Sequence, residues 1–420
     1  MVRQKHRNEY ITGLDIGSQN IRVAVGQISG THANDREVQI IGAIEVPSEG
    51  VQKGVVTSIE EIVSSLANAI ETAEKITGVP IEHVWVGLSG THIICHDSKG
   101  VVAVARSDGE ITEEDVARAL EASKTVATPL NYEILHVLPR SFSVDGQTGI
   151  KDPIGMTGIR LEVDTKIIFG ITAHVKNITK AIYRTGVDID DFVLSVIAAG
   201  NVVLTGRQKE LGSVVINIGS ATTSLVVYEE GDIVHTAVLP VGSAHITNDL
   251  ALGLKTSIDT AERVKVEYGQ CVTQGLSKKD MVDLSTLGSN ESETVSRYYI
   301  SQIIEARVSE ILQKVDNELT KVSRSGLLPA GAYFVGGGAR LGGLIELAKE
   351  QLQLPASLGY PLTVQSITDK VQDPAFASVI GLVKWGSSFT NTPVQSGQNW
   401  RGMPAKMMQG MRSFLKNLLP

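Results

Sequence analysis

The apolar residues of this chain follow two different periods, one typical of strands and one typical of helices. Short runs rich in valine and isoleucine predict strands, and at two places one such run follows another after a glycine-bearing turn. These paired runs cover residues 10–25 and 214–228. Both pairs are therefore predicted to be β-hairpins, far apart in the chain but alike in pattern.

Apolar residues spaced three and four apart predict the helices. The clearest cover residues 58–76, 260–268 and 297–322. Gly78 is the expected end of the first, and Thr112 with Asp115 forms a predicted capping box. The remaining predictions are a short helix at 178–185, strands at 38–41, 84–86, 132–138 and 160–168, a segment leading into the second half at 192–199 and a loop at 285–294.

Three glycine-bearing turns carry the candidate chemistry. They contain Asp15-Ile16-Gly17-Ser18, then Asn217-Ile218-Gly219-Ser220, and last Gly336-Gly337-Gly338. Converging backbone amides in such a turn form an anion site, and glycine lets phosphate approach without a Cβ in the way. One glycine turn is weak evidence, because such turns occur in most sheets. Three in this order favour a duplicated domain that closes on one nucleotide.

That order of turns resembles the actin-like ATPase superfamily, and the residues between the hairpins resemble the FtsA family of bacterial cell-division proteins. Residues 87–92, 136–139 and 149–161 are similar to the insert that FtsA carries and actin lacks. The resemblance covers residues 10–386 and resumes at the C-terminus. It implies an α/β, actin-like (ribonuclease H-like) duplicated two-domain fold with an α+β insert and a C-terminal amphipathic helix.

The resemblance also implies where the domains begin and end. The first actin-like domain is expected in three pieces, the second in one, and the insert between them. The expected ranges are 1–86, 167–193 and 372–386 for the first domain, 87–166 for an SHS2-like insert, 194–371 for the second domain with a small subdomain at 244–315, 387–399 for a linker and 400–420 for a membrane-targeting helix. The alternative for the insert is a decoration without a function of its own.

One half of the implied nucleotide site matches the family pattern. The backbone at Gly336, Gly337 and Gly338 would support the purine. Glu262 and Lys265, three residues apart on one helix face, resemble the pair that reaches the ribose hydroxyls, although such a pair alone is more often a surface ion pair. The other implied contacts are Asp15 through a magnesium-bound water, and Gly17, Ser18, Gly219 and Thr222 with the phosphates. For Asp15 the alternative is a residue that only caps its own turn.

The other half departs from the family pattern. Asn20 stands where the family usually has lysine, and Asn217 stands where it usually has aspartate. Arg140 replaces a glutamine expected near the attacking water. Phosphoryl transfer depends on positioning and charge, so these changes predict slow or absent hydrolysis. We hypothesise that Arg140 restores the positive charge missing at Asn20.

Composition limits the class of protein. The chain has 420 residues, of which 42% are hydrophobic and 20% charged, so it can bury more than one core. Its two cysteines, Cys95 and Cys271, show no metal or disulfide spacing, which suits a reducing compartment. No secretory signal and no run of 18 apolar residues is present. The net charge of −8 argues against nucleic-acid binding.

The C-terminal residues differ in composition from the rest. After Asp373 no acidic residue occurs, and residues 387–398 are rich in small polar residues, which predicts a linker. Beyond Pro404 an apolar stripe with interspersed cations predicts an interfacial helix on an anionic membrane. The stripe consists of Met407, Met408, Met411, Phe414, Leu415 and Leu418, and the cations are Lys406, Arg412 and Lys416. The alternative is a helix docked on the protein itself or on a partner.

The resulting hypothesis is an FtsA-like protein that binds ATP or ADP with magnesium and hydrolyses it slowly or not at all. It would self-assemble and tether FtsZ filaments to the cytoplasmic face of the membrane, as a peripheral protein at the division site. Other division proteins would bind the insert, and Arg297 and Arg307 would contact FtsZ. The alternatives are a PilM-like pilus-assembly protein and a scaffold that binds no nucleotide. A sugar kinase is disfavoured because no substrate-binding acid stands out.

Overall fold

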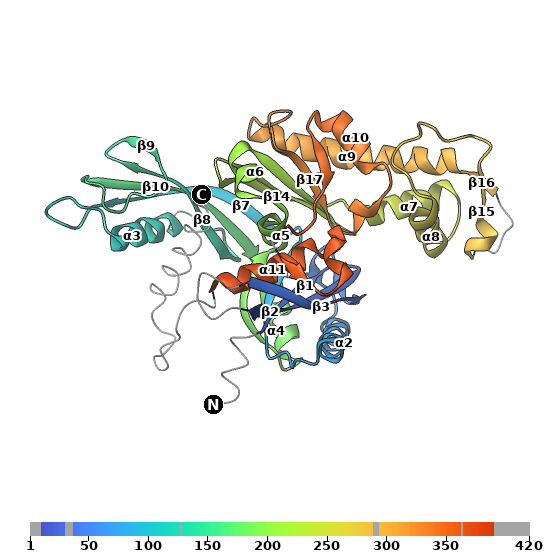
Figure 1. Cartoon of the computed structure of the whole chain (residues 1–420), viewed down its shortest axis with the longest axis horizontal. Coiled ribbons are helices and arrows are strands. Elements are labelled where there is room, and N and C mark those ends of the chain that lie inside the picture. Colours follow the sequence, from blue (N-terminus) through green and yellow to red (C-terminus); the bar gives the residue numbers. More distant parts are fainter. Residues whose placement is uncertain (1–9, 30–36, 126–127, 289–293, 363, 390–420) are drawn as a thin grey trace.

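The computed structural model describes residues 10–29, 37–125, 128–288, 294–362 and 364–389. The predicted linker and membrane helix lie outside these residues, except that residues 387–389 continue the last helix. Within the described ranges, no helix is both long enough and apolar enough to span a membrane. The described chain forms two large sheets, a separate four-stranded sheet and a helical extension (Figure 1).

The first sheet contains the first predicted hairpin. Its strand order is β11-β6-β1-β2-β3-β19. β1 to β3 form an antiparallel meander, and β6 and β11 continue the sheet in parallel with β1. The strands are β1 Tyr10–Ile16, β2 Asn20–Ser29, β3 Glu37–Pro47, β6 His83–Leu88, β11 Asp188–Leu194 and β19 Gln365–Ser366. The predicted strand at 38–41 is thus the beginning of a longer one.

The second sheet repeats this arrangement, as expected of a duplicated fold. Its order is β14-β13-β12-β17-β18, in which β12 to β14 form an antiparallel meander and β17 and β18 run parallel to β12. The strands are β12 Ser213–Ile218, β13 Thr223–Glu229, β14 Asp232–Leu239, β17 Gly331–Val335 and β18 Ala356–Leu358. Each meander is therefore followed by two parallel strands on the same side.

Two helices pack between the sheets. α11 (Ala377–Phe389) contacts β1 and β2, α5 (Ser195–Val203) contacts β12 and β13, and the two helices contact each other. The segment 192–199 thus divides into the end of β11 and the start of α5. α2 (Ile59–Thr77) packs on β2 and β3, with Ser58 as its N-cap and Gly78 as a left-handed C-cap, as predicted. The other elements of this half are β4 Val51–Gln52, β5 Val55–Val56, α4 Thr172–Tyr183, η3 Asp369–Gln372 and η4 Pro374–Phe376. α6 (Gly206–Leu211) packs on β13 of the second sheet.

The insert has a core of its own. Its sheet has the order β7-β10-β8-β9, and α3 packs on it. Thr112 and Asp115 form the predicted capping box at the start of α3. The elements are β7 Ile93–Ala103, α3 Glu113–Lys124, β8 Tyr132–Val144, β9 Gln147–Ile150 and β10 Arg160–Ile171. Both predicted strands of the insert are longer than expected, because residues beyond each predicted end continue the pairing.

The helical extension packs on the outer face of the second sheet. Its long helix α9 buries the predicted apolar stripe. The elements are α7 Ser243–Gly253, α8 Ile258–Tyr268, β15 Met281–Asp283, η1 Leu284–Leu287, β16 Thr294–Ser296, α9 Arg297–Lys321, η2 Gly337–Arg340 and α10 Leu344–Leu352. The segment 285–294 was expected to be a loop, but its start is a short 3₁₀ helix capped by the Asp283 side chain. Likewise α4 begins at Thr172, before the predicted 178.

Candidate functional site

The first two glycine turns have the same geometry. In each, the glycine amide donates to a carbonyl three residues on: Gly17 to Asn20 at 3.0 Å and Gly219 to Thr222 at 2.9 Å. A Cβ on Gly17 would lie 2.7 Å from the carbonyl oxygen of Asn20. Only glycine fits such a turn without displacing backbone. The Ser18 hydroxyl accepts a hydrogen bond from the Gly54 amide at 3.1 Å.

The second and third turns meet at the ends of two parallel strands. β12 and β17 pair, with Asn217 opposite Val335. Gly336 has a φ of +88°, and a Cβ there would lie 2.2 Å from Oδ1 of Asn217. The Asn217 amide donates to the Ser378 hydroxyl at 3.3 Å. Asn217 is thus a hydrogen-bonded packing residue.

The first hairpin reaches the third turn through Arg22. A Cβ built on Gly337 would have one heavy atom within 4 Å, Nη2 of Arg22 at 3.8 Å. The Arg22 side chain is 12% exposed and donates from Nε to Glu45 at 2.7 Å. Its guanidinium also lies over the Phe376 ring, 5.7 Å from the centroid. The second and third turns therefore meet, and Arg22 of the first hairpin places a cation beside the open space at Gly337. This region, with the first hairpin turn, is called here the glycine junction.

Asp15 is buried beside Arg22 in this junction. The two residues are opposite each other in the hairpin register. Burial raises the pKa of Asp15, while the hydrogen bond from Ser195 and the charge of Arg22 lower it. The Ser195 hydroxyl donates to Asp15 Oδ1 at 2.7 Å. Gly87 leaves room for this contact, because a Cβ there would lie 2.6 Å from Ser195 Oγ and 2.7 Å from Asp15 Oδ1.

Glu262 and Lys265 lie together on α8, as their spacing predicts. Lys265 donates to Glu262 at 2.7 Å and to the Thr247 hydroxyl at 2.9 Å, and Thr247 donates to Glu262 at 2.5 Å. Lys265 is buried, with 8% of its surface exposed. The pair is therefore a partly buried polar cluster with α7 and not an exposed surface ion pair.

Among the described residues, Arg140 makes no hydrogen bond or ion pair with the glycine junction. It is an exposed residue of β8 in the insert. Burial raises the pKa of Asp232, at the start of β14, and the charge of Arg140 partly opposes that rise. No contact between Arg140 and Asn20 occurs among the described residues. The hypothesis that Arg140 compensates for Asn20 therefore stays a prediction. Arg22 is the cation that faces the third turn.

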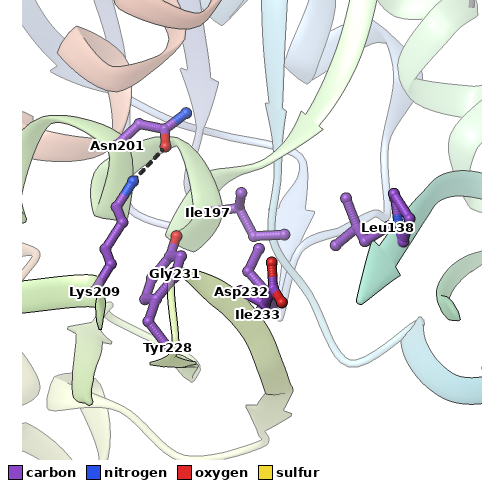
Figure 2. Close-up of a pocket in the computed structure, with 9 residues that line it drawn as sticks. Leu138, Ile197, Asn201, Lys209, Tyr228, Gly231, Asp232 and Ile233 are labelled. Carbon is purple, nitrogen blue, oxygen red and sulfur yellow. Dashed lines mark hydrogen bonds between the residues drawn. The ribbon is translucent and has the colours of Figure 1, made fainter. Parts of the chain in front are cut away.

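A small cavity lies near Arg140, at the seam between the insert and the second domain (Figure 2). Its volume of about 20 Å³ is enough for one water molecule but not for a nucleotide. Lys209 donates to Asn201 at 2.9 Å and lies 5.1 Å from the centre of the Tyr228 ring. Burial lowers the pKa of Lys209 to about 8. This cavity is a packing feature of the seam.

The two arginines expected to contact FtsZ are both bound within the chain. Arg297 pairs with Asp280 at 3.3 Å. Arg307 makes two hydrogen bonds to Asp249, at 2.5 and 2.9 Å, and also pairs with Glu310. Arg307 thus connects α9 to α7.

Sequence reasoning missed Arg22, Ser195 and Thr247. The register of the first hairpin could have suggested Arg22, because it places this residue opposite Asp15. Ser195 and Thr247 had no local signal, since each meets its partner only after distant elements pack.

Comparison with known families agrees with this architecture. The sequence matches the family described as Cell division protein FtsA over residues 214–381, and the SHS2 domain inserted in FtsA over residues 90–169. It is 34% identical to the cell division protein FtsA of Pseudomonas aeruginosa over 376 residues, covering 90% of this chain and 89% of that one. It is 35% identical to FtsA of Bacillus subtilis over 404 residues, covering 96% and 89%.

Solved structures show the same fold at lower identity. A PilM–PilN type IV pilus biogenesis complex contains a chain that is 19% identical, with a TM-score of 0.65, covering 90% of this chain and 98% of that one. MreB5 of Spiroplasma citri bound to ADP is 14% identical, with a TM-score of 0.53, covering 93% and 99%. The fold is thus actin-like. The identity and coverage of the FtsA relatives go further, and this chain belongs to the FtsA family of cell division proteins.

Proposed function

We propose that this chain binds an adenine nucleotide at the glycine junction and hydrolyses it slowly or not at all. The observation that carries the proposal is the open space beside Gly337, which faces the guanidinium of Arg22. MreB5, which shares the fold, was solved with ADP. The bound nucleotide would act as an assembly switch, while the protein joins FtsZ filaments to the membrane at the division site.

The residues of the junction fit a nucleotide. The amide-bearing turns at Gly17 and Gly219 suit phosphate oxygens, and Arg22 supplies a positive charge that Asn20 does not. Glu262 and Lys265 would meet the ribose from the α8 side. A magnesium ion would be held by the phosphates, waters and Asp15, since one or two carboxylates are usually enough. Such an ion would neutralise phosphate charge.

Slow hydrolysis is expected because of the residues on the phosphate side of the site, of which Asn217 and Asp15 are two. Asn217 carries no charge, and its amide donates to Ser378. Asp15 accepts from Ser195. Losing a single group that positions or stabilises the transition state costs on the order of a hundredfold or more in rate. We therefore expect binding with little turnover.

Equilibrium titration with ADP and ATP, together with an ATP turnover assay, tests this proposal. Wild-type protein is expected to bind both nucleotides and to turn over ATP at a rate close to the buffer blank. Gly337→Asp fills the open space with a negative charge, so binding should be lost. Gly206→Asp is the matched control, because Gly206 also has open space around it and lies on α6, away from the junction. Fast turnover, or equal binding by both variants, would contradict the proposal.

The membrane part of the proposal concerns residues outside the described structure. The stripe from Met407 to Leu418 would bind lipid, with its cations attracted to anionic headgroups. Flotation with anionic liposomes is the test. Removal of the residues after Gly397 and the variant Phe414→Glu should both release the protein. Retention of both on the vesicles would move the anchor elsewhere.

The FtsZ-binding part of the proposal concerns the helical extension. Tyr299 and Met281 are exposed there, at 44% and 51%, beside Arg297. Co-sedimentation with FtsZ filaments can separate a contact from a structural role. Arg297→Asp should weaken binding, and the charge swap with Asp280→Arg should not restore it, because the swap repairs only the internal ion pair. Full recovery in the swap would make Arg297 a structural residue.

The scaffold that binds no nucleotide has one observation in its favour. Glu262 and Lys265 satisfy each other and Thr247 within the described structure. If purified protein retains no nucleotide and the titration shows no binding, this alternative replaces the switch.

A further inference from the structure

A side chain of the insert, His136 of β8, reaches the start of α5. Its Nε2 accepts a hydrogen bond from the Leu194 amide at 3.3 Å. Leu194 is the N-cap residue of α5, and its own side chain makes no capping bond. The His136 ring also lies 6.1 Å from the ring of Trp385 in α11. A residue of the insert thus contacts both of the helices that pack between the two large sheets.

The backbone of β8 is irregular on both sides of this histidine. Its pairing with β10 skips Leu135 and Arg140. Such irregularities bend a strand and redirect its side chains. Beside His136, Val137 packs on the core of the insert, whereas Leu138 belongs to the core that contains α5 and α11. The segment 136–139 is therefore where the insert joins the core of the nucleotide-binding half.

The contact at Leu194 continues to the glycine junction through the next residue. Ser195 is 1% exposed, and its hydroxyl donates to Asp15 Oδ1 at 2.7 Å. Burial lowers the pKa of His136 to about 4, so at neutral pH the ring is uncharged and one of its nitrogens can accept. Hydrogen bonds on two consecutive residues thus connect the insert to a carboxylate of the junction.

We propose that His136 is a positioning residue of the nucleotide site: it holds the start of α5 in the place from which Ser195 orients Asp15. The inference rests on the proposed function, in which Asp15 helps to hold the magnesium ion of the bound nucleotide. In that case the insert takes part in nucleotide binding without contacting the nucleotide.

Titration of the full chain with ADP, in magnesium and in EDTA, tests this role. His136→Leu keeps a side chain of similar size but removes the acceptor. Affinity for ADP should therefore fall roughly fivefold in magnesium, which is the value of one ordinary hydrogen bond, and should hardly change in EDTA. His136→Gln retains an acceptor near the position of Nε2 and should bind like the wild type. His96→Leu is the matched control, because His96 is an exposed histidine on β7 of the same insert.

The route through Ser195 has its own test. Ser195→Ala should weaken ADP binding with the same dependence on magnesium. The double variant with His136→Leu should lose no more than the larger single loss, because both changes interrupt the same path. In nucleotide-free protein, His136→Leu should accelerate hydrogen exchange at residues 194–196 and 15–18 and leave α3 unchanged.

Several results would overturn the inference. They are wild-type affinity in His136→Leu, an equal loss with and without magnesium, a loss that His136→Gln does not restore, and additive losses in the double variant. If thermal unfolding shows that His136→Leu does not fold, His136→Asn takes its place, since its shorter side chain holds the acceptor away from Leu194. Wild-type protein that binds no ADP overturns the proposed function and this inference together, whereas wild-type binding with an unaffected His136→Leu overturns the inference alone.

Discussion

At the scale of single residues, buried neutral histidines make stability depend on pH. His92 is 2% exposed, its ring lies 5.4 Å from that of His174, and neither of its ring nitrogens has a hydrogen-bond partner in the described structure. Burial, with a smaller contribution from His174, lowers the pKa of His92 to about 4. In the unfolded chain the same histidine has a pKa near 6.5. As the pH falls, the unfolded state therefore takes up this proton at a higher pH than the folded state does.

We expect this histidine to destabilise the fold as pH falls from about 6.5 towards 4. At pH 5.5 its share of the loss is on the order of 1 kcal/mol. Urea unfolding at pH 7.5 and 5.5 measures the difference, and His92→Phe should reduce it by this amount. If the variant keeps the same pH dependence, the effect comes from other groups. His136 is one such group, because burial also lowers the pKa of His136 to about 4.

A second prediction at this scale concerns Gly87. Its missing Cβ makes room for the hydrogen bond between Ser195 and Asp15. Gly87→Ala should cost about 1–3 kcal/mol, because it forces a methyl group into a packed site. Thermal unfolding measures this cost, with Gly206→Ala as the control at a glycine that has open space. Adding Ser195→Ala should recover part of the loss, and strict additivity of the two changes would contradict the contact.

At the scale of elements, helix α3 depends on its cap. Asp115 is fully buried and accepts hydrogen bonds from the backbone and side chain of Thr112 and from the Ala105 amide, and it also pairs with Arg118. Burial opposes its charge, but these hydrogen bonds together lower the pKa of Asp115 to about 2. One carboxylate thus joins the start of α3 to the loop after β7.

Thr112→Ala should therefore destabilise the insert by about 1 kcal/mol. Hydrogen exchange is expected to accelerate in α3 and to stay unchanged in β1 and β12. Thr125→Ala, at the other end of the helix, should have the smaller effect, because its hydroxyl bonds only within the last turn. A uniform acceleration across the molecule would show instead that the insert does not unfold on its own.

At the scale of the whole molecule, the insert is held to the second domain as well as to the first. Lys151 pairs with Asp232 and donates to the carbonyl oxygen of Glu230 at 3.0 Å. Burial raises the pKa of Asp232, and Lys151 opposes that rise. These contacts join the end of β9 to the turn before β14, so the insert touches the second sheet directly.

Lys151→Ala should loosen this seam, at a cost of about 1 kcal/mol because the pair is partly exposed. Faster hydrogen exchange is expected in β9 and at the start of β14. Lys151→Arg should retain the ion pair and near wild-type exchange. If Lys151→Ala leaves exchange at both places unchanged, the ion pair does not hold the seam.

Features that depend on neighbouring residues could be predicted from the amino-acid sequence. The two hairpins, the Gly78 cap, the Thr112 capping box and the stripe of α9 all follow from propensities and spacings within a few residues. Their order along the chain was also enough to indicate an actin-like fold and the FtsA family. Strand ends were less certain, since pairing with a partner strand extended β3 and β8 beyond their local signals.

Which residues meet at the glycine junction depends on how distant elements pack. Ser195 reaches Asp15 across 180 positions, and Arg22 faces Gly337 because two separate sheets pack about α5 and α11. Arg140 lies instead beside Asp232, in the seam of the insert. Local pattern carries no information about such contacts, because the free energy that forms them comes from burying surfaces that are remote in the chain.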